Sequence, residues 1–418
     1  MDINKLLSGV DCACGKRHEC DIEYVFVEDG AIARLTDICG RYSKILIVAD
    51  ENTYGAAGEA TESALSGKVI GRVIFSGKTV LIPNEESVAE VNRHLSDADL
   101  IVGIGSGVIQ DLCKYVSHTQ KVPYMVVATA PSMDGYASNG AAMIMGGMKV
   151  TYAAGLPRAL IADTSVLRNA PMEMIKAGYG DIIGKYSALN DWKLSRCVNG
   201  EYFCDYIYDL TYEMIEKTLS VAEGLVKRDK ESLKVLTEAL IVVGILMSFA
   251  GSSRPASGSE HHLSHFFEIV GILDGEEYFP HGIDVAYSTI VTAKIRKEIL
   301  SRPFPQKIVR ENEETLHENI RKIYSSAADG CIALQNKVGN YASDRSRVYL
   351  EKEEEIRAIL AEVPSPESIE EMLLRVGLDS AEFTKLYSEE KIKNAVKYAK
   401  DLKDRYTVLW VNYDFGNC

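Results

Sequence analysis

The chain has 418 residues, which suggests two or three domains, and its 46% hydrophobic and 25% charged content is that of a folded protein. Its net charge of −14 argues against a general nucleic-acid binder. The longest apolar stretch, Ala239–Ala250, is about half of a bilayer span, so no transmembrane segment is expected. Nine cysteines and no visible signal peptide favour reduced thiols and a cytoplasmic location.

The first part of the chain alternates Val- and Ile-rich runs with helical segments, which is typical of a parallel sheet buried on both faces. Several of these runs end in small or acidic residues, and ligands bind at the carboxyl ends of such strands. The expected strands are Ile22–Glu28, Lys44–Ala49, Val69–Phe75, Leu100–Ile104, Pro123–Thr129 and Leu160–Ala162.

From Pro171 onward a helical periodicity of 3.6 residues replaces this pattern. Charged helical segments follow from 307 to 403, broken at Pro364 and Pro366. We therefore predict an α/β domain over residues 1–168 and an all-α domain over residues 169–418. The long helices expected before residue 301 are Met172–Leu194, Glu213–Lys227, Glu231–Ala250, His261–Leu273 and Asp284–Leu300.

A glycine-rich turn connects the fourth expected strand to a helix at Val108–Tyr115. Gly103, Gly105 and Gly107 would let backbone N–H groups approach a pyrophosphate at the helix N-terminus. The spacing is GxGxG rather than the GxGxxG of ordinary dinucleotide-binding turns. A tight strand-to-helix turn that simply needs glycine is the alternative, and the motif alone leaves the two evenly balanced.

An acidic residue, Asp50, follows the second expected strand. A carboxylate at that place can accept hydrogen bonds from ribose hydroxyls and would repel a 2′-phosphate. The alternative is an N-cap for the next helix, which is at least as well supported. Together with the glycine-rich turn, Asp50 favours NAD over NADP.

Four of the eight histidines lie close together, at His261, His262, His265 and His281. His261 and His265 share one helix face, whereas His262 points about 100° away. Imidazoles and one carboxylate make a three-ligand catalytic site for zinc or iron with one open position. Asp181, flanked by small residues, is the best carboxylate candidate.

A second cluster of metal-binding residue types lies near the N-terminus, at Cys12, Cys14, His18 and Cys20. These residues suit zinc, but four ligands within nine residues is tighter than usual zinc spacing. We therefore favour a hairpin of reduced thiols over a structural zinc site.

The run from Gly105 to Lys114 resembles the GGxxxD-xx-K turn of the iron-containing alcohol dehydrogenase and dehydroquinate synthase superfamily, with Ser106 in place of the second glycine. The order of the turn, Asp181 and the histidines agrees with that superfamily. Three further stretches resemble its sn-glycerol-1-phosphate dehydrogenase family, in the longer bacterial branch: Thr129–Ser138, Gly180–Trp192 and Ser253–His261.

The resemblance implies a Rossmann-like N-terminal domain and a dehydroquinate synthase-like helical domain. It places one divalent metal on Asp181, His261 and His281, makes His265 a supporting or proton-handling residue, and turns Asp134 toward the substrate's hydroxyls. Lys185 stands where related alcohol dehydrogenases have a further histidine, which favours zinc or nickel over iron. The residues expected to bind NAD, or alternatively NADP, are Asp50, Gly105, Ser106, Gly107, Asp111, Thr129, Ser132 and Ser138.

The implied reaction is reduction of dihydroxyacetone phosphate, a small phosphorylated substrate, to sn-glycerol 1-phosphate by NADH. Its phosphate needs cationic partners, and we expect Arg254 and Lys185, aided by the hydroxyls of Ser257 and Ser259. A salt bridge is the alternative for Arg254. The other functions considered are a glycerol dehydrogenase, a dehydroquinate synthase-like lyase and a silent NAD-binding protein. Family habit suggests a homodimer or larger homo-oligomer.

Overall fold

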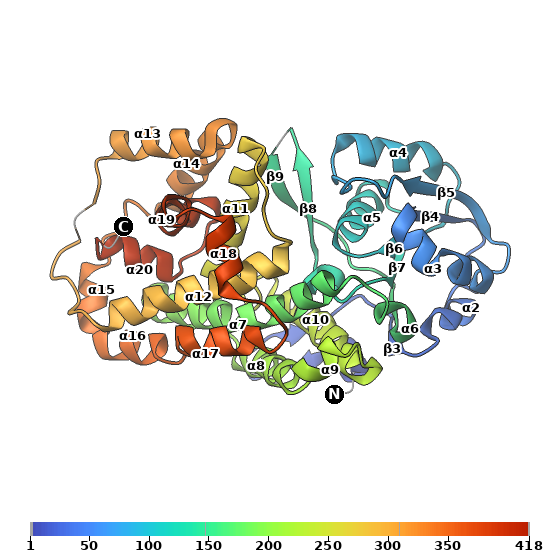
Figure 1. Ribbon diagram of the computed structural model, residues 1–418, viewed down its shortest axis with the longest axis horizontal. Coiled ribbons are helices and arrows are strands. Elements are labelled where there is room, and N and C mark those ends of the chain that lie inside the picture. Colours follow the sequence, from blue (N-terminus) through green and yellow to red (C-terminus); the bar gives the residue numbers. More distant parts are fainter. Residues whose placement is uncertain (1–2, 147, 309, 417–418) are drawn as a thin grey trace. The chain divides into compact units, whose positions relative to one another are not determined.

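The computed structural model describes residues 3–146, 148–308 and 310–416 (Figure 1). It contains two compact units, each made of two chain segments. Unit 1 comprises Met1–Ile182 and Glu216–Ser253, and unit 2 comprises Ile183–Ile215 and Arg254–Cys418. The expected boundary between residues 168 and 169 differs from this division, because the chain returns to unit 1 at Glu216–Ser253 after the first segment of unit 2.

Unit 1 is built on a six-stranded parallel sheet with the order β3-β10-β7-β6-β4-β5. From β4 the chain moves outward to β5 and then crosses to β6 on the other side of β4. The point between β4 and β6 is therefore the topological switch point of the sheet. The strands are β3 (Tyr24–Glu28), β4 (Ile45–Asp50), β5 (Val69–Phe75), β6 (Leu100–Gly105), β7 (Tyr124–Ala128) and β10 (Ala159–Asp163).

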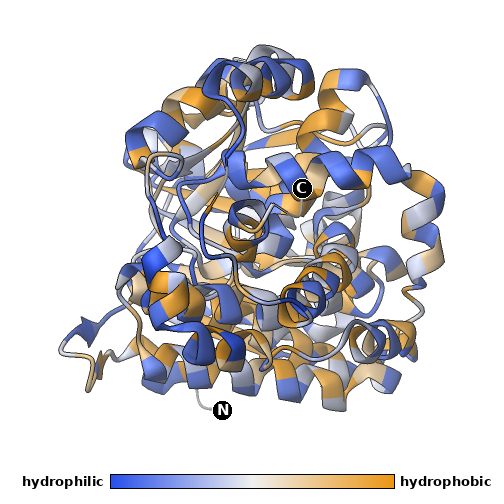
Figure 2. Cartoon of the chain, turned by 90° about the vertical axis from the view of Figure 1, so that its left-hand side faces the viewer, coloured by the Kyte–Doolittle hydropathy of each residue, from blue (hydrophilic) through white to orange (hydrophobic). Residues whose placement is uncertain are grey.

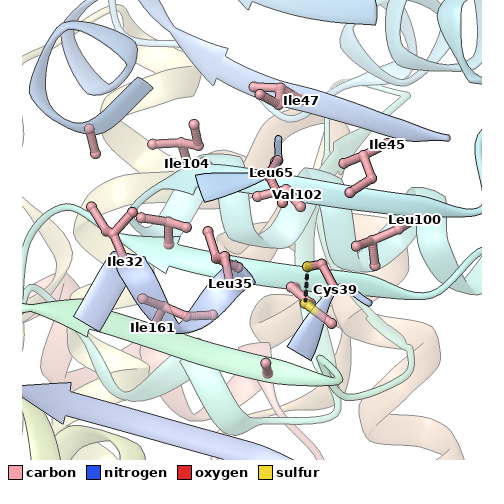
Figure 3. Packing of buried hydrophobic residues seen from close by; sticks show 14 of the residues in the cluster. Ile32, Leu35, Cys39, Ile45, Ile47, Leu65, Leu100, Val102, Ile104 and Ile161 are labelled. Atoms are coloured by element: carbon pink, nitrogen blue, oxygen red, sulfur yellow. Dashed lines mark hydrogen bonds between the residues drawn. The ribbon is translucent and has the colours of Figure 1, made fainter. Parts of the chain in front are cut away.

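The six expected strands all appear, with bounds shifted by at most two residues. Their continuous apolar runs become strands buried on both faces: every residue of β6 and β7 is buried. Figure 3 shows part of this core, in which Ile47, Val102 and Ile161 of the strands belong to one buried cluster with Ile32 and Leu35. Burial of each such side chain stabilises the unit by about 1.5–3 kcal/mol.

Two hairpins in unit 1 add strands that were not predicted, although the first lies at the N-terminal cysteine cluster, where a hairpin was expected. The first joins β1 (Val10–Asp11) to β2 (Arg17–His18), and the second joins β8 (Gly140–Met145) to β9 (Met148–Ala153). The first has only two residue pairs, too few to show a periodic pattern. The helices wholly within unit 1 are α1 (Ile3–Leu7), η1 (Ala31–Arg34), α2 (Leu35–Ile38), α3 (Glu51–Ala64), α4 (Glu85–Leu95), α5 (Gly107–Gln120), η2 (Asp134–Ala137), α6 (Thr164–Leu167), α9 (Ala222–Val226) and α10 (Lys230–Ala250).

Helix α10 is long and apolar enough to cross a membrane by length and composition, and it is the one such helix among the described residues. However, 72% of its most apolar window is buried inside the protein. It packs against η2, α6 and α9 of unit 1. We therefore assign α10 to the core of unit 1.

Unit 2 is helical, and helices α7 (Met172–Asn199) and α8 (Asp205–Ser220) each run through the division between the units. Hydrophilic and hydrophobic residues alternate along its helices in Figure 2, as in amphipathic helices that bury one side. Pro366 opens α17 behind its N-cap Ser365, which explains the break expected there. The other helices are α11 (Ser259–Asp274), α12 (His281–Leu300), α13 (Glu313–Tyr324), η3 (Ser325–Ala327), α14 (Ala328–Val338), α15 (Ser346–Glu351), α16 (Glu353–Leu360), α17 (Pro366–Leu374), α18 (Ser380–Leu386), α19 (Glu389–Tyr398), η4 (Ala399–Leu402) and α20 (Val408–Asp414).

Candidate active site

Three of the residues expected to bind a dinucleotide meet at the carboxyl edge of the sheet in unit 1. Asp50 ends β4, Gly105 ends β6, and Thr129 directly follows β7. These strands are neighbours in the order β7-β6-β4, and the Thr129 N–H donates to the Gly105 carbonyl at 3.3 Å. The expected residues therefore lie beside the switch point, where open α/β sheets bind their ligands.

Asp50 is the N-cap of α3. Its Oδ1 accepts hydrogen bonds from the N–H groups of Asn52 (2.8 Å) and Thr53 (2.9 Å), and the Thr53 hydroxyl closes a capping box. The alternative role considered for Asp50 is thus present. Both cap bonds end on Oδ1, so a ribose contact through Oδ2 stays a prediction.

The glycines of the turn have different surroundings. A Cβ on Gly103 would lie 2.8 Å from Cys113 Sγ, and one on Gly105 would lie 2.7 Å from Ile109. Close packing of α5 against β6 therefore requires both glycines. Gly107 is the first residue of α5, after the N-cap Ser106, and a Cβ there would meet only Met133, at 3.5 Å. Packing therefore does not require glycine at 107, and the binding of a phosphate at its N–H stays a prediction.

Lys114, at the end of the motif, is fully buried and organises the neighbouring loop. Its Nζ donates to the carbonyls of Gly135 (2.9 Å) and Gly140 (2.8 Å) and to Ser138 Oγ (3.2 Å). Burial lowers the pKa of Lys114, and the Asp111 carboxylate 3.5 Å away opposes that effect. Asp111 and Ser138 thus support the Lys114 ammonium, and their contact with a cofactor stays a prediction.

The segment that carries Ser132 and Asp134 packs closely on helix α7. Both side chains are buried, and the Asp134 N–H donates to Asp181 Oδ2 at 2.9 Å. A Cβ on Gly178 would lie 1.9 Å from the Pro131 carbonyl oxygen. The small residue before Asp181 therefore permits the approach of another chain segment, as the sequence predicted.

A metal-binding group forms at the expected residues. One ligand atom from each of Asp181, His261 and His281 lies within 4.8 Å of the other two. Asp181 stands on α7, His261 in the first turn of α11, and His281 at the start of α12. One turn after Asp181, a Cβ on Gly184 would lie 2.5 Å from the Val285 side chain, so glycine is what lets α7 approach α12.

Hydrogen bonds orient both imidazoles of this group. His261 Nδ1 lies 2.7 Å from Glu260 Oε1, and His281 Nδ1 lies 3.3 Å from Ser264 Oγ. With the proton on Nδ1, each ring presents Nε2 as the metal ligand. Glu260 is fully buried, and burial raises its pKa. An outer carboxylate behind a histidine ligand is a recurring feature of metal sites.

His265 and His262 take the separate places that the helical spacing predicted. The His265 ring centroid lies 5.6 Å from that of His281 and 6.3 Å from that of His261, beside the ligands. His262 is fully buried, and neither of its ring nitrogens has a hydrogen-bond partner among the described residues. Burial and the charge of Arg405 lower the pKa of His262, so this ring stays neutral.

Arg254 is buried and holds a salt bridge with Glu201. Its Nε lies 2.7 Å from Glu201 Oε1, its Nη2 bonds to Glu201 Oε2, and its Nη1 donates to the Tyr406 carbonyl at 3.0 Å. This is the alternative that was considered for Arg254, so any phosphate contact has to coexist with the Glu201 pair.

Two other cations contact the backbone of the segment that Arg254 opens. Lys185 Nζ donates to the Ala256 carbonyl at 3.0 Å, and Arg405 Nη1 donates to the Ser257 carbonyl at 3.0 Å. Burial, together with the charge of Arg254, lowers the pKa of Arg405 to about 10. Three basic side chains thus gather at one short segment that leads into α11.

Sequence reasoning missed Glu260, Ser264 and Arg405. Glu260 had a signal, since a carboxylate directly precedes the expected ligand His261. Arg405 had none, because it is far from the histidines in the chain and contacts this segment only in the folded unit.

The chain is similar to known dehydrogenases. The model of a family described as iron-containing alcohol dehydrogenase matches residues 26–171. Three proteins named glycerol-1-phosphate dehydrogenase [NAD(P)+] align with it. That of Geobacillus stearothermophilus is 29% identical over 96% of this chain and 94% of its own. That of Bacillus velezensis is 30% identical over 88% and 84%, and that of Halalkalibacterium halodurans is 33% identical over 69% and 74%.

Solved structures show the same fold at low sequence identity. An iron-containing alcohol dehydrogenase from Thermococcus thioreducens aligns with a TM-score of 0.62 at 15% identity, covering 96% of this chain and 100% of that one. A glycerol dehydrogenase from Schizosaccharomyces pombe aligns with a TM-score of 0.53 at 17% identity, covering 87% and 91%. The expected combination of a Rossmann-like α/β part and a helical part is confirmed.

Proposed function

Because the chain belongs to the glycerol-1-phosphate dehydrogenase family, we propose that it reduces dihydroxyacetone phosphate to sn-glycerol 1-phosphate with NADH, reversibly. The observation that carries this proposal is the group of Asp181, His261 and His281, with supporting hydrogen bonds to each ligand. The names of the relatives supply the phosphorylated product and the choice of NAD(P).

The three ligands suit one divalent metal. One carboxylate and two imidazoles form a common set for zinc, nickel or iron, and three protein ligands leave a position for substrate. Bound there, the ion would act as a Lewis acid on the substrate's carbonyl oxygen. We keep zinc or nickel ahead of iron, because Lys185 stands in place of a histidine that would be the fourth ligand, and its Nζ donates to the Ala256 carbonyl.

The protein's own residues would orient the reactants and handle one proton. The Asp134 N–H fixes one carboxylate oxygen of Asp181, while Glu260 and Ser264 fix the two imidazoles. A bound NADH would supply the hydride, and the alkoxide oxygen formed from the carbonyl would then need a proton. His265 lies beside both ligand imidazoles and is the proposed proton donor, directly or through water.

We place NADH at the carboxyl edge of the sheet in unit 1. Gly107 offers its N–H at the start of α5 to the pyrophosphate, and Asp50 Oδ2 is the proposed ribose acceptor. We expect Gly105, Ser106 and Thr129 to contact NADH at the same edge of the sheet, and Ser132 to contact it from the loop that follows β7. A carboxylate at Asp50 favours NADH over NADPH.

The substrate's phosphate would bind near the segment that opens with Arg254. Arg254, Lys185 and Arg405 gather there, and Arg405 carries a guanidinium whose charged form is destabilised by burial and by Arg254. A bound dianion would relieve this repulsion, whereas an unphosphorylated polyol would not. This cation cluster therefore favours a phosphorylated substrate over glycerol.

The first experiment is NADH oxidation by metal-reconstituted protein with dihydroxyacetone phosphate, and with dihydroxyacetone as the control. We expect fast turnover with the phosphorylated ketone alone and its loss on chelation. Preference for dihydroxyacetone would point to a glycerol dehydrogenase, and no turnover with either ketone would point to the lyase reaction. Turnover that is unchanged by chelation would contradict the proposed role of the metal.

Variants of two arginines distinguish a role in phosphate binding from a role in stabilising the fold. Arg405→Met should lower kcat/KM for dihydroxyacetone phosphate about 100-fold and leave the rate with dihydroxyacetone unchanged. Arg254→Met should also lower the free energy of unfolding, by about 2 kcal/mol, because it leaves Glu201 without its partner. Equal losses with both ketones in Arg405→Met would contradict the phosphate role.

We also propose a homodimer or larger homo-oligomer and a cytoplasmic location. The eight described cysteines form no disulfide with one another, which agrees with a reducing compartment. Light scattering on protein that elutes from a size-exclusion column measures the mass of the oligomer. Fractionation of the source cells tests the location.

A further inference from the structure

The hairpin of β1 and β2 brings two cysteines and a histidine together. Val10 pairs with His18, and the Gly15 N–H donates to the Cys12 carbonyl at 3.0 Å. Gly15 has a φ of +85°, a left-handed conformation that glycine adopts without strain. This turn leaves Cys14 Sγ 3.4 Å from His18 Nε2.

His18 is held as a metal ligand is usually held. The ring is buried at 1% exposure and stacks on Phe249, with centroids 5.2 Å apart and planes 14° apart. Its Nδ1 lies 3.2 Å from the Phe249 carbonyl oxygen. A proton on Nδ1 therefore donates to that carbonyl and leaves the Nε2 lone pair facing Cys14.

A fourth ligand comes from a distant part of the chain. Ligand atoms of Cys12, Cys14, His18 and Cys204 all lie within 4.8 Å of one another. Cys204, directly before α8, is fully buried. Tetrahedral zinc with Zn–S bonds of about 2.3 Å separates its sulfur ligands by about 3.8 Å, which this spacing accommodates.

Cys20, the fourth member of the sequence cluster, is not in this group. The objection to four ligands within nine residues therefore disappears, because only three come from the hairpin.

We propose that Cys12, Cys14, His18 and Cys204 bind one structural Zn²⁺. Three thiolates and one imidazole form a closed tetrahedral set, which leaves no position for substrate. Binding converts three thiols to thiolates, so it releases up to three protons per zinc and becomes weaker at low pH. The site shares no residue with the Asp181 group, and its existence does not depend on the proposed reaction.

The test is the metal content of purified full-length protein after dialysis against EDTA, which removes accessible ions. Wild type should keep about one zinc per chain, and a mercurial thiol reagent should release it. Cys204→Ser and Cys14→Ser should each lose that zinc. Cys20→Ser, a cysteine of the same segment outside the group, is the matched control and should keep it.

Replacement of zinc by Co²⁺ identifies the ligands in the wild-type protein, so this measurement does not require that a variant folds. Protein loaded with Co²⁺ should show an intense thiolate-to-metal charge-transfer band that Asp/His/His ligation cannot produce. Wild type without this band, or a Cys204→Ser variant with unchanged zinc and an unchanged band, would overturn the proposal. A disulfide among these cysteines in protein purified with a reductant, found by mass spectrometry, would overturn it as well.

Discussion

Asp50 and Asp181 are both carboxylates at places where the sequence predicted a ligand, yet their neighbourhoods differ. At the carboxyl edge of the sheet, Asp50 caps α3, and Gly103 and Gly105 make room for α5. Every one of these residues has a structural task that is complete without a cofactor.

The metal group is different, because other residues form hydrogen bonds to the side chains of its ligands. Glu260 and Ser264 each engage the Nδ1 side of an imidazole, and Asp134 engages one oxygen of Asp181. These bonds hold the ligand side chains in place, and Glu260 Oε1 in addition accepts from the Gly258 N–H at the start of α11 (2.8 Å). Bonds that prepare an atom for a further partner are thus stronger evidence of function than residue type at an expected place.

The largest expected effect tests the metal group directly. His281→Ala should remove the bound metal and lower kcat by about 1,000-fold or more, because the Lewis acid contributes several kcal/mol to the transition state. Metal analysis and NADH oxidation measure the two effects. His94→Ala, which changes an exposed side chain of α4, is the control. Full metal content in His281→Ala would contradict the assignment.

A smaller effect is expected from the outer carboxylate. Glu260→Gln should weaken metal binding about 10- to 100-fold, since the charge that strengthens His261 as a ligand is lost while the shape is kept. Competition with a chelator of known affinity measures the change. An unaltered affinity would make Glu260 a packing residue and weaken the contrast drawn above.

The glycine-rich turn offers a matched pair of variants. Gly105→Ala should lower the free energy of unfolding by about 1–3 kcal/mol, because its Cβ would lie 2.7 Å from Ile109. Gly107→Ala has room and should keep stability but raise KM for NADH. Denaturant unfolding measures the loss of stability, and initial rates measure KM for NADH. An unchanged KM in Gly107→Ala would mean that the turn serves only the packing of α5.

The smallest effect concerns Asp50. Asp50→Asn should leave stability within about 0.5 kcal/mol, because asparagine caps helices as well as aspartate does. If Oδ2 accepts from the ribose, KM for NADH should rise several-fold in the same variant. Equal KM values for wild type and Asp50→Asn would show that the cap is the whole role of Asp50.

The sheet could be predicted because Val- and Ile-rich runs mark its strands. For the metal group, the local signal was the gathering of histidines and the helical spacing that separates His261 and His265 from His262, whereas the set of three ligands was implied by the family resemblance. The division of the chain could not be predicted, because the place of α10 depends on which surface covers its apolar side. The role of Cys204 was equally hidden, since nothing near it in the sequence marks a ligand.

The two-segment composition of unit 1 has a consequence for synthesis on the ribosome. Asp134 and Ala137 pack against Gly244 of α10, where a Cβ would lie 2.8 Å from the Asp134 carbonyl oxygen. Helix α10 emerges from the exit tunnel long after the sheet has been translated. Nascent unit 1 therefore cannot complete its packing, and leaves this surface uncovered, until the segment that ends at Ser253 has emerged.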